Sequence, residues 1–180
     1  MSERKLEKLV ILIDSREQQP LIFRQFPEVI TIREKLDVGD YSIRGYEDKG
    51  IAVERKNSLD ELCTAIGKGR VNFEEEMQRA KDFDAFFLIV EGNPNDFLFG
   101  NYERSHLDPH SARASICDWI WEYGVRPIFV SSPMEASMWV VELFKKYLVN
   151  KEKGTIKEII KFGGENGKEG KWNEWKSWEW

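Results

Sequence analysis

Residues 36–60 read L-D-V-G-D-Y-S-I-R-G-Y-E-D-K-G-I-A-V-E-R-K-N-S-L-D. Two segments of this stretch, Tyr41 to Arg44 and Ile51 to Lys56, alternate apolar and polar side chains on either side of a turn bracketed by glycines. Such a pattern predicts a β-hairpin. Ser58 followed three residues later by Glu61 forms a capping box, so we expect a helix to begin just after the second strand.

Strands and helices continue to alternate outward from this hairpin. Leu9 to Asp14 is an almost continuous apolar run, typical of a strand covered on both faces, and Val29 to Ile32 is a second strand candidate. Downstream of the hairpin, the pattern predicts one helix just after Lys56 and a second over 71–81, with Gly67 and Gly69 between them. A strand over Ala85 to Glu91 and a long loop over Gly92 to Leu107 follow. Asp108-Pro109 opens a helix that ends near Gly124, Arg126 to Val130 is the last strand, and Ser132-Pro133 opens a final helix that ends near Asn150. This order predicts an α/β domain with a mixed sheet.

The overall composition limits the classes of protein to consider. With 180 residues the chain is long enough for one ordinary globular domain. Hydrophobic residues make up 41% and charged residues 33%, so the chain can bury a core. The 27 Lys and Arg against 32 Asp and Glu give a net charge of -5, which argues against a basic coat protein for nucleic acid. This balance leaves open a DNA enzyme whose acidic residues hold metal ions.

The sequence predicts neither a membrane protein nor a secreted one. Its longest uninterrupted apolar run, Ala85 to Val90, is far shorter than the roughly 20 residues that a membrane helix needs. The charged N-terminus is followed by only five apolar residues, Leu9 to Ile13, too few for a signal-peptide core. We expect an intracellular protein, in the cytoplasm or nucleoid of a microbe or the nucleus of a eukaryote. We expect Cys63 and Cys117 to be small buried thiols that form no disulfide.

Two carboxylates and a lysine converge across the predicted hairpin. Asp40 begins one strand, while Glu54 and Lys56 stand two residues apart on the other and therefore point to the same face. Together with the backbone carbonyl of Arg55, the two carboxylates offer the oxygen ligands that Mg²⁺ prefers. Lys56 beside a metal-bound water suits phosphodiester hydrolysis, because the metal polarises the phosphate while the lysine orients the nucleophile. For an isolated E-x-K at a strand end, the alternative is a solvated ion pair.

The whole string resembles the nuclease domain of the XPF family of structure-specific DNA endonucleases, which includes the archaeal Hef-type enzymes. The signature of that family is G-D, a spacer, and E-R-K-x-x-x-D, and it stands here as Gly39-Asp40, Glu54-Arg55-Lys56 and Asp60. Further pieces match in order: Asp14-Ser15-Arg16-Glu17, L-D-V-G-D-Y before the hairpin, Gly69-Arg70, Phe73, Arg79, Ile89 to Gly92, and Ser131 to Pro133. The likeness covers roughly Leu9 to Leu148, and so many ordered matches are far more specific than an E-x-K alone.

The resemblance implies a restriction-endonuclease-like fold, in which helices flank a mixed central sheet. It also implies that residues 1–150 form a nuclease domain that depends on Mg²⁺ or Mn²⁺ and cuts branched DNA, such as flaps and forks, in repair, replication or recombination. The alternative is a catalytically silent scaffold of the same fold that binds DNA or a partner. The set of two acids and a lysine favours the enzyme, because a scaffold has no chemical use for it.

Site roles follow from the same resemblance. The family motif implies a catalytic set with metal ligands Asp40, Glu54 and Asp14, a water-orienting Lys56, and Arg55, Asp60 and Glu17 as further members. Arg55 alternates with its neighbours along the strand, so we expect its side chain to point to the opposite face and to pair with Asp60 or Glu17.

Basic residues and histidines are further candidates for function. Arg16 beside the site, and Lys68 and Arg70 in a glycine-flanked turn, are candidate contacts to DNA phosphates, with a merely basic surface turn as the alternative. His106 and His110 lie near a helix start, and a histidine general base is conceivable. Because the family pattern needs no histidine, we expect both to be exposed or capping residues.

The two late helices, 109–124 and 133–150, carry apolar residues on more than one face. A helix that is apolar nearly all round needs a second surface to cover it. We therefore expect a homodimer through these helices, since the nuclease domains of the family associate in pairs. Trp119, Trp121 and Trp139 lie in the same helices, and we interpret them as packing residues rather than as platforms for DNA bases.

Residues 151–180 are the least family-like part of the chain. We expect a short helix over Thr155 to Phe162 and then a flexible tail, in which Trp172, Trp175 and Trp178 recur every three residues after a glycine-rich linker. The tail is either a docking peptide for a replication or repair protein, a segment that folds back onto its own domain, or an appendage without a partner.

The region after Asn150 does not resemble the tandem helix-hairpin-helix module that usually grips duplex DNA in this family. An acidic domain with few phosphate contacts is expected to bind DNA weakly and with strong salt sensitivity. We expect the grip on DNA to come from dimerisation, from the Gly92 to Leu107 loop, or from a partner.

Overall fold

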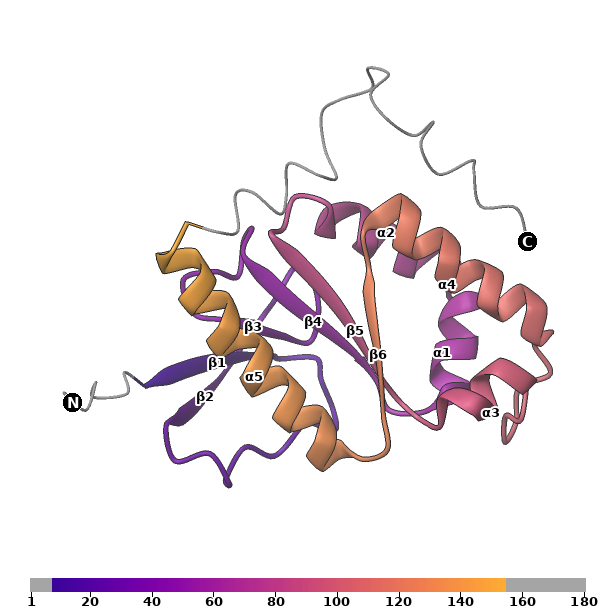
Figure 1. The fold of residues 1–180 in the computed structure, drawn as a ribbon, viewed down its shortest axis with the longest axis horizontal. Coiled ribbons are helices and arrows are strands. Elements are labelled where there is room, and N and C mark those ends of the chain that lie inside the picture. Colours follow the sequence, from indigo (N-terminus) through magenta and orange to yellow (C-terminus); the bar gives the residue numbers. More distant parts are fainter. Residues whose placement is uncertain (1–7, 155–180) are drawn as a thin grey trace, which may run out of the picture.

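The computed structural model describes residues 8–154 of the chain. Its elements are, in order, β1 (Leu9–Asp14), β2 (Val29–Glu34), β3 (Tyr41–Ile43), β4 (Ile51–Lys56), α1 (Leu59–Ile66), α2 (Arg70–Ala80), β5 (Ala85–Glu91), α3 (Pro94–Phe99), α4 (Pro109–Tyr123), β6 (Arg126–Val130) and α5 (Pro133–Glu152). The strands form one sheet in the order β2-β1-β3-β4-β5-β6, with helices on both faces (Figure 1). The predicted mixed α/β architecture is therefore confirmed. The expected helix over Thr155 to Phe162 and the tryptophan-rich tail lie outside the described residues.

The sheet consists of two parallel blocks joined by one antiparallel strand. β1 runs parallel to β2, and β4, β5 and β6 run parallel to one another. β3 is antiparallel to both of its neighbours, with Tyr41 opposite Ile13 of β1 and opposite Val53 of β4. This register brings the end of β1, the turn before β3 and the end of β4 to one edge of the sheet, which is where the candidate site lies.

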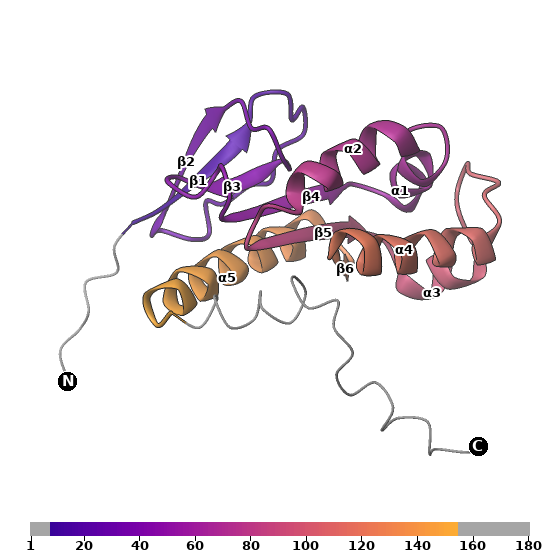
Figure 2. The same cartoon turned by 90° about the horizontal axis from the view of Figure 1, so that it is seen from above.

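Two apolar clusters, one on each face, hold the helices on the sheet. α5 covers one face, where Val140 and Phe144 are fully buried against β1, β3 and β4. α1, α2 and α4 cover the other face and bury Leu62, Met77 and Trp119 (Figure 2). Each such side chain contributes roughly 1.5–3 kcal/mol when it is fully buried. Successive residues of β4 and β5 alternate between the two clusters, which explains why these strands read as continuous apolar runs.

The expected loop over Gly92 to Leu107 contains a short helix, α3, that the sequence prediction missed. Asn93 caps it by accepting a hydrogen bond from the amide of Asn95, and Pro94 occupies its first position. Gly100 ends the helix in the left-handed conformation, with φ of 77°. The signal was present, since an N-cap followed by proline also opens α4 and α5. Six residues with only Phe97 buried give no helical periodicity to confirm it.

The remaining element boundaries agree closely with the prediction. β2 continues to Glu34, β3 ends at Ile43, and α2 begins at Arg70. Within residues 8–154, no helix combines the length and the hydrophobicity that crossing a membrane requires.

The two cysteines lie in different environments. Cys63 is buried in α1, and burial raises the pKa of its thiol. Cys117 is exposed, so the prediction of two buried thiols is wrong for this residue. The buried face of α4 includes Ile116 and Trp119, which leaves position 117 on the outer side of the helix.

Candidate active site

An acidic cavity of about 410 Å³ opens at the edge of the sheet where β1 and β4 end. Seven acidic side chains and three arginines line it: Asp14, Glu17, Asp37, Asp40, Glu54, Glu61 and Glu76, with Arg16, Arg55 and Arg79. Four of the seven catalytic candidates therefore contribute carboxylates to a single cavity, and Arg55 also lines it.

The Gly39-Asp40 turn is the backbone anchor of this cavity. Gly39 has φ of +73°, and a Cβ atom at this position would lie 2.9 Å from the carbonyl oxygen of Val53. Only glycine fits such a close approach without strain. The amide of Asp40 donates to the same Val53 carbonyl at 2.9 Å, and the Asp40 carbonyl accepts from the Asp14 amide at 2.8 Å. These contacts fix Asp40 between β1 and β4.

Asp40 and Glu54 are the two carboxyl groups of the cavity whose pKa values are raised. Asp40 Oδ2 accepts a hydrogen bond from the Arg55 amide at 2.8 Å, yet burial raises the pKa of Asp40 to about 7. Glu54 is only 7% exposed, and burial, followed by the nearby charge of Asp40, raises its pKa well above the usual range. In both groups the second carboxylate oxygen accepts no hydrogen bond from residues 8–154. A proton or a cation is needed to relieve this charge.

Lys56 is fixed beside Glu54, as predicted from their spacing of two. Its Nζ lies 2.5 Å from Glu54 Oε1 and 4.7 Å from the centroid of the Phe73 ring. Burial lowers the pKa of Lys56, but the charge of Glu54 outweighs this effect and raises the pKa above its ordinary value. The ammonium group therefore stays protonated against Glu54, although Lys56 is not among the residues that line the cavity.

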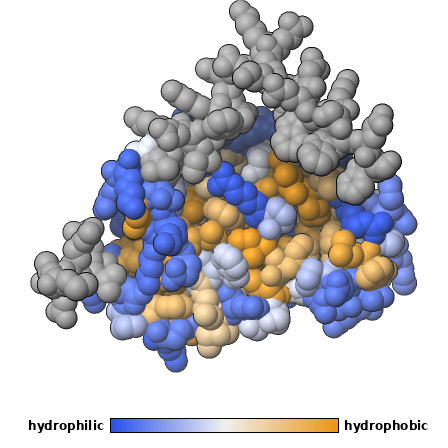
Figure 3. Space-filling model, viewed as in Figure 1, coloured by the Kyte–Doolittle hydropathy of each residue, from blue (hydrophilic) through white to orange (hydrophobic). Residues whose placement is uncertain are grey.

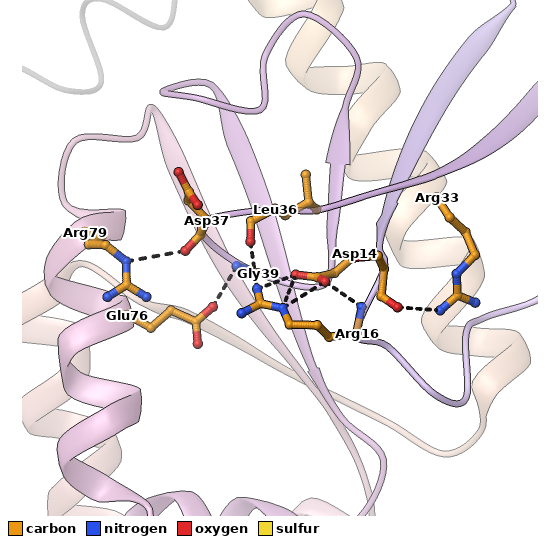
Figure 4. A network of polar contacts seen from close by, with 9 residues as sticks. Asp14, Arg16, Arg33, Leu36, Asp37, Gly39, Glu76 and Arg79 are labelled. Atoms are coloured by element: carbon orange, nitrogen blue, oxygen red, sulfur yellow. Dashed lines mark hydrogen bonds and ion pairs between the residues drawn. The ribbon is translucent and has the colours of Figure 1, made fainter.

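Asp14 reaches the cavity but is bound by Arg16. Arg16 Nη2 lies 2.5 Å from Asp14 Oδ2, and the Arg16 amide and Nε both donate to Asp14 Oδ1 (Figure 4). Burial raises the pKa of Asp14, but the hydrogen bonds from Arg16 outweigh it and lower the pKa overall. Arg16 Nη2 also donates to the Leu36 carbonyl at 2.7 Å, while most of its side chain remains exposed. Asp14 can therefore bind a cation only if Arg16 moves away or if one carboxylate oxygen contacts Arg16 and the cation together.

The donor set fits Mg²⁺ or Mn²⁺ only with water as an additional ligand. Among the residues that the structure describes, no group of three or more acidic, histidine or cysteine side chains is arranged to hold a metal ion. Asp40 and Glu54 nevertheless line one cavity with free carboxylate oxygens and raised pKa values. Mg²⁺ is commonly bound by one or two carboxylates and retains several waters. These residues therefore fit such an ion without a third direct ligand.

Arg55 points away from Glu54 and Lys56, as expected, but its partner differs from the prediction. Its Nε donates to Glu91 at 2.6 Å and its Nη1 donates to the Gln19 carbonyl at 2.7 Å, whereas Asp60 and Glu17 were the expected partners. In the parallel register Arg55 lies opposite Ile89, so Glu91, two residues further along β5, is on the same face. Both side chains of this pair are buried, and breaking such a pair costs about 3–5 kcal/mol.

Asp60 is not part of the acidic cavity. Its Oδ1 accepts hydrogen bonds from the amides of Arg104 at 3.0 Å and Ser105 at 2.7 Å. Burial raises the pKa of Asp60, but the backbone hydrogen bonds together outweigh it and lower the pKa overall. Asp60 lies in the first turn of α1, where it faces the segment between α3 and α4. The structure therefore gives Asp60 the contacts of a loop anchor.

The other sequence candidates lie at different distances from the cavity. Glu17 lines it and accepts from the Gln19 amide at 2.6 Å. Lys68 lines a second cavity of about 670 Å³, together with Asp60 and Arg104, and this second cavity also shares Asn57 and Glu61 with the first.

Arg70 does not project into either cavity. It pairs with Glu74 at 2.6 Å and donates to Ser115 of α4 at 2.9 Å, so it bridges two helices. His106 and His110 are both exposed and outside the acidic cavity, which agrees with the expectation for these residues.

Of the three tryptophans in the late helices, only Trp119 is a core residue. It packs edge-on against Phe73, with ring centroids 5.0 Å apart, and its Nε1 donates to Glu74. Trp121 and Trp139 are exposed at 79% and 43%, so the interpretation of all three as packing residues is wrong for these two within the single chain.

Comparisons with known proteins show the family and the fold of this chain. A family model described as the ERCC4 domain matches residues 13–143. XPF from Aeropyrum pernix is 25% identical, with a TM-score of 0.58, over 75% of this chain and 64% of that chain. XPF from Aeropyrum pernix in complex with DNA is 23% identical, with a TM-score of 0.57, over 81% of this chain and 66% of that one. This chain thus spans just under two thirds of the length of these chains. No curated protein matches it in sequence.

The raised pKa of Asp40 predicts a pH-dependent loss of stability in the cation-free protein. The pKa of Asp40 is about 7 in the folded state, above its ordinary value of 3.8. The contribution of protonated Asp40 to the free energy of unfolding is therefore fully present below about pH 4 and is lost as the pH rises through about 7. Asp40→Asn removes this loss while keeping an acceptor for the Arg55 amide. In urea unfolding with a chelator, we expect the variant to exceed wild type by on the order of 2 kcal/mol at about pH 8 and to match it near pH 4.

The control for this experiment is Asp118→Asn, which changes an exposed aspartate of α4 and is expected to match wild type at both pH values. An equal difference between Asp40→Asn and wild type at the two pH values would contradict the prediction.

The contacts of Asp60 predict a local effect on the segment between α3 and α4. Asp60→Ala leaves the amides of Arg104 and Ser105 without their acceptor, so we expect faster hydrogen exchange over residues 103–107. Affinity for Mn²⁺ should stay unchanged because Asp60 is outside the acidic cavity. The matched control is Asp48→Ala at an exposed aspartate. Unchanged exchange over residues 103–107 would show that the two hydrogen bonds do not hold this segment.

Proposed function

This chain belongs to the ERCC4 domain family, and from that premise we propose that it is a Mg²⁺- or Mn²⁺-dependent endonuclease that hydrolyses phosphodiester bonds in branched DNA. The observation that carries the proposal is a pair of carboxylates in one cavity, half-buried Asp40 and buried Glu54, with the ammonium group of Lys56 fixed against Glu54. The likeness to the XPF nuclease fold supports the same reaction class. A DNA substrate places the protein in a compartment that contains DNA.

The residues of the cavity divide the chemical work. A divalent cation, when bound, polarises the scissile phosphate and lowers the pKa of a bound water. Asp40 and Glu54 would hold that cation, and the carbonyl oxygen of Arg55 is a further candidate ligand. Lys56 keeps its proton because of Glu54, so its Nζ donates a hydrogen bond to the attacking water or to a phosphate oxygen. The exposed part of Arg16 offers positive charge to phosphate at the cavity mouth.

DNA is the substrate class that the surroundings of the cavity favour. The second cavity, which continues from the acidic one through Asn57 and Glu61, is lined by Lys68 and Arg104. We infer that a DNA strand follows this path, with these two cations on its phosphates. XPF from Aeropyrum pernix is a member of the same fold that forms a complex with DNA. Two cations on an acidic domain give only weak and salt-sensitive binding, so a second copy of the chain is needed to hold a branched substrate.

A second copy of this chain is the proposed occupant of the apolar surface on α4 and α5. This surface consists of exposed side chains of the two helices, namely Ile120, Trp121, Met134, Met138 and Trp139. Hydrophobic residues gather over α5, β6 and α4 in Figure 3. Between the helices runs β6, the edge strand of the sheet, whose outer side no strand among the described residues covers. A two-fold pairing buries both the apolar surface and the open edge.

Cleavage assays test the nuclease directly. Labelled duplex, splayed-arm and 3′-flap DNA is incubated with the protein, with and without Mg²⁺ or Mn²⁺. We expect cation-dependent cutting of the branched substrates, and a loss of at least about 100-fold in rate for Asp40→Asn or Glu54→Gln, because each removes a charge that holds the cation. Glu75→Gln, at an exposed glutamate of α2, is the control and should cut like wild type. If wild type binds these substrates yet leaves them intact with either cation, the scaffold alternative is correct.

The oligomeric state follows from the apolar surface. We expect sedimentation at micromolar concentration to give the mass of two chains for wild type and of one chain for Trp121→Glu or Met138→Lys, because each variant buries a charge in the pairing surface. Val71→Lys introduces the same charge at an apolar residue of α2 that is 70% exposed and outside this surface, and it should remain a dimer. A wild-type mass of one chain contradicts the proposed pairing.

A further inference from the structure

Glu76 is a half-buried carboxylate of the acidic cavity that lies outside the family signature. It comes from α2, on which Phe73, Met77 and Ala80 are buried against the sheet. Position 76 lies beside this buried face of α2, so the Glu76 side chain points toward the end of the sheet where the acidic cavity opens. Its Oε1 accepts a hydrogen bond from the Gly39 amide at 2.7 Å (Figure 4).

This hydrogen bond ties α2 to the turn that carries Asp40. The Asp40 amide is held by the Val53 carbonyl and its carboxylate by the Arg55 amide, and both of these bonds lead to β4. The amide of Gly39, one residue earlier, would have no acceptor among residues 8–154 without Glu76. An unsatisfied amide in a buried turn costs about 1–3 kcal/mol. Glu76 therefore completes the set of contacts that fixes the backbone next to Asp40.

Glu76 forms no ion pair within the described part of the chain. The three arginines of the cavity make their direct contacts elsewhere: Arg16 with Asp14, Arg55 with Glu91, and Arg79 with the carbonyls of Asp37 and Glu75. The charge of Glu76 nevertheless acts on Arg16, whose pKa it helps to raise after Asp14. Residues 8–154 provide no ion pair to Glu76 and no donor to its Oε2. Its negative charge reaches both Asp40 and Glu54 and adds to the effect of burial in raising their pKa values.

We propose that Glu76 is a positioning residue of the cation site, which holds Asp40 in place through the Gly39 amide and adds a third negative charge to the field that attracts the divalent ion. This inference rests on the proposed metal-dependent function. Since residues 8–154 contain no group of three acidic, histidine or cysteine side chains arranged around one ion, the second contribution of Glu76 acts through the charge of its carboxylate. A purely structural Glu76 would contribute the hydrogen bond alone.

Two substitutions separate the hydrogen bond from the charge. Glu76→Gln keeps a carbonyl oxygen that accepts from the Gly39 amide but removes the charge. Glu76→Ala removes both. Glu75→Gln changes the neighbouring glutamate, which is exposed on the same helix, and controls for the loss of one negative charge at the surface. Thermal unfolding without cation establishes that the variants remain folded.

The test measures the dissociation constant for Mn²⁺ on the full chain, by titration calorimetry and by the paramagnetic resonance of free Mn²⁺, without DNA. We expect Glu76→Gln to weaken Mn²⁺ binding by about tenfold while Glu75→Gln matches wild type, because one charge inside a shielded cavity outweighs one in open solvent. A higher salt concentration should reduce the difference in Mn²⁺ dissociation constant between Glu76→Gln and wild type. For Glu76→Ala we expect the same loss of affinity and, in addition, slower cleavage that saturating Mn²⁺ does not restore, because the Gly39 amide loses its acceptor and the backbone next to Asp40 is held less firmly.

The outcomes distinguish the inference from the function on which it rests. If wild type binds Mn²⁺ and Glu76→Gln binds it equally tightly, Glu76 does not contribute its charge and the inference is wrong while the nuclease proposal stands. If wild type binds neither Mn²⁺ nor Mg²⁺, both are wrong. If Glu76→Ala at saturating Mn²⁺ cuts as fast as wild type, the positioning role is overturned.

Discussion

Asp40 is held in place by three hydrogen bonds that also join the two halves of the sheet. Its amide donates to Val53, its carbonyl accepts from Asp14, and its carboxylate accepts from the Arg55 amide. β3 alone connects the parallel pair β1–β2 to the parallel block β4–β6, so these bonds occur where the sheet changes direction. The close approach of Gly39 to the Val53 carbonyl makes the turn possible. The residues that connect the two parallel parts of the sheet are thus the same residues that lie at the centre of the acidic cavity.

This coincidence explains why buried carboxylates persist in the fold despite their cost. Burying Asp40 and Glu54 without full compensation disfavours the folded state whenever both are ionised. Arg16 and Lys56 each neutralise one carboxylate of the cavity, Asp14 and Glu54. Under the proposed function, a divalent cation would compensate the remaining negative charge and would stabilise the protein by binding only to the folded state. Stability and cation affinity are therefore linked: a variant that removes a destabilising carboxylate charge makes the cation-free protein more stable but weakens its binding of the cation.

The sequence predicted those parts of the site that depend on local geometry. The spacing of two between Glu54 and Lys56 predicted their shared face, and the intervening Arg55 points the other way. Glu91 could not be assigned as the partner of Arg55, because the pairing depends on the parallel register of β4 and β5 across a long helical connection. Asp60 belongs to the signature in sequence, yet helical geometry directs it to another loop. The exposure of Cys117 and the short helix α3 depend on packing that no periodicity of the sequence expresses.

Glu76 is a site residue that the sequence could not identify. Its neighbours Phe73 and Met77 predict which face of α2 packs on the sheet, but not which turn this face meets. Only the tertiary arrangement brings the helix to Gly39. The acidic cavity and the apolar surface of α4 and α5 are likewise separated in the sheet, since the cavity lies at β1, β3 and β4 while the surface flanks the edge strand β6. Under the proposed pairing, a second copy on that edge would leave the acidic cavity open and add a second one to the particle. The second copy would also bring its own Lys68 and Arg104, and with them the additional phosphate contacts that a single acidic domain does not have.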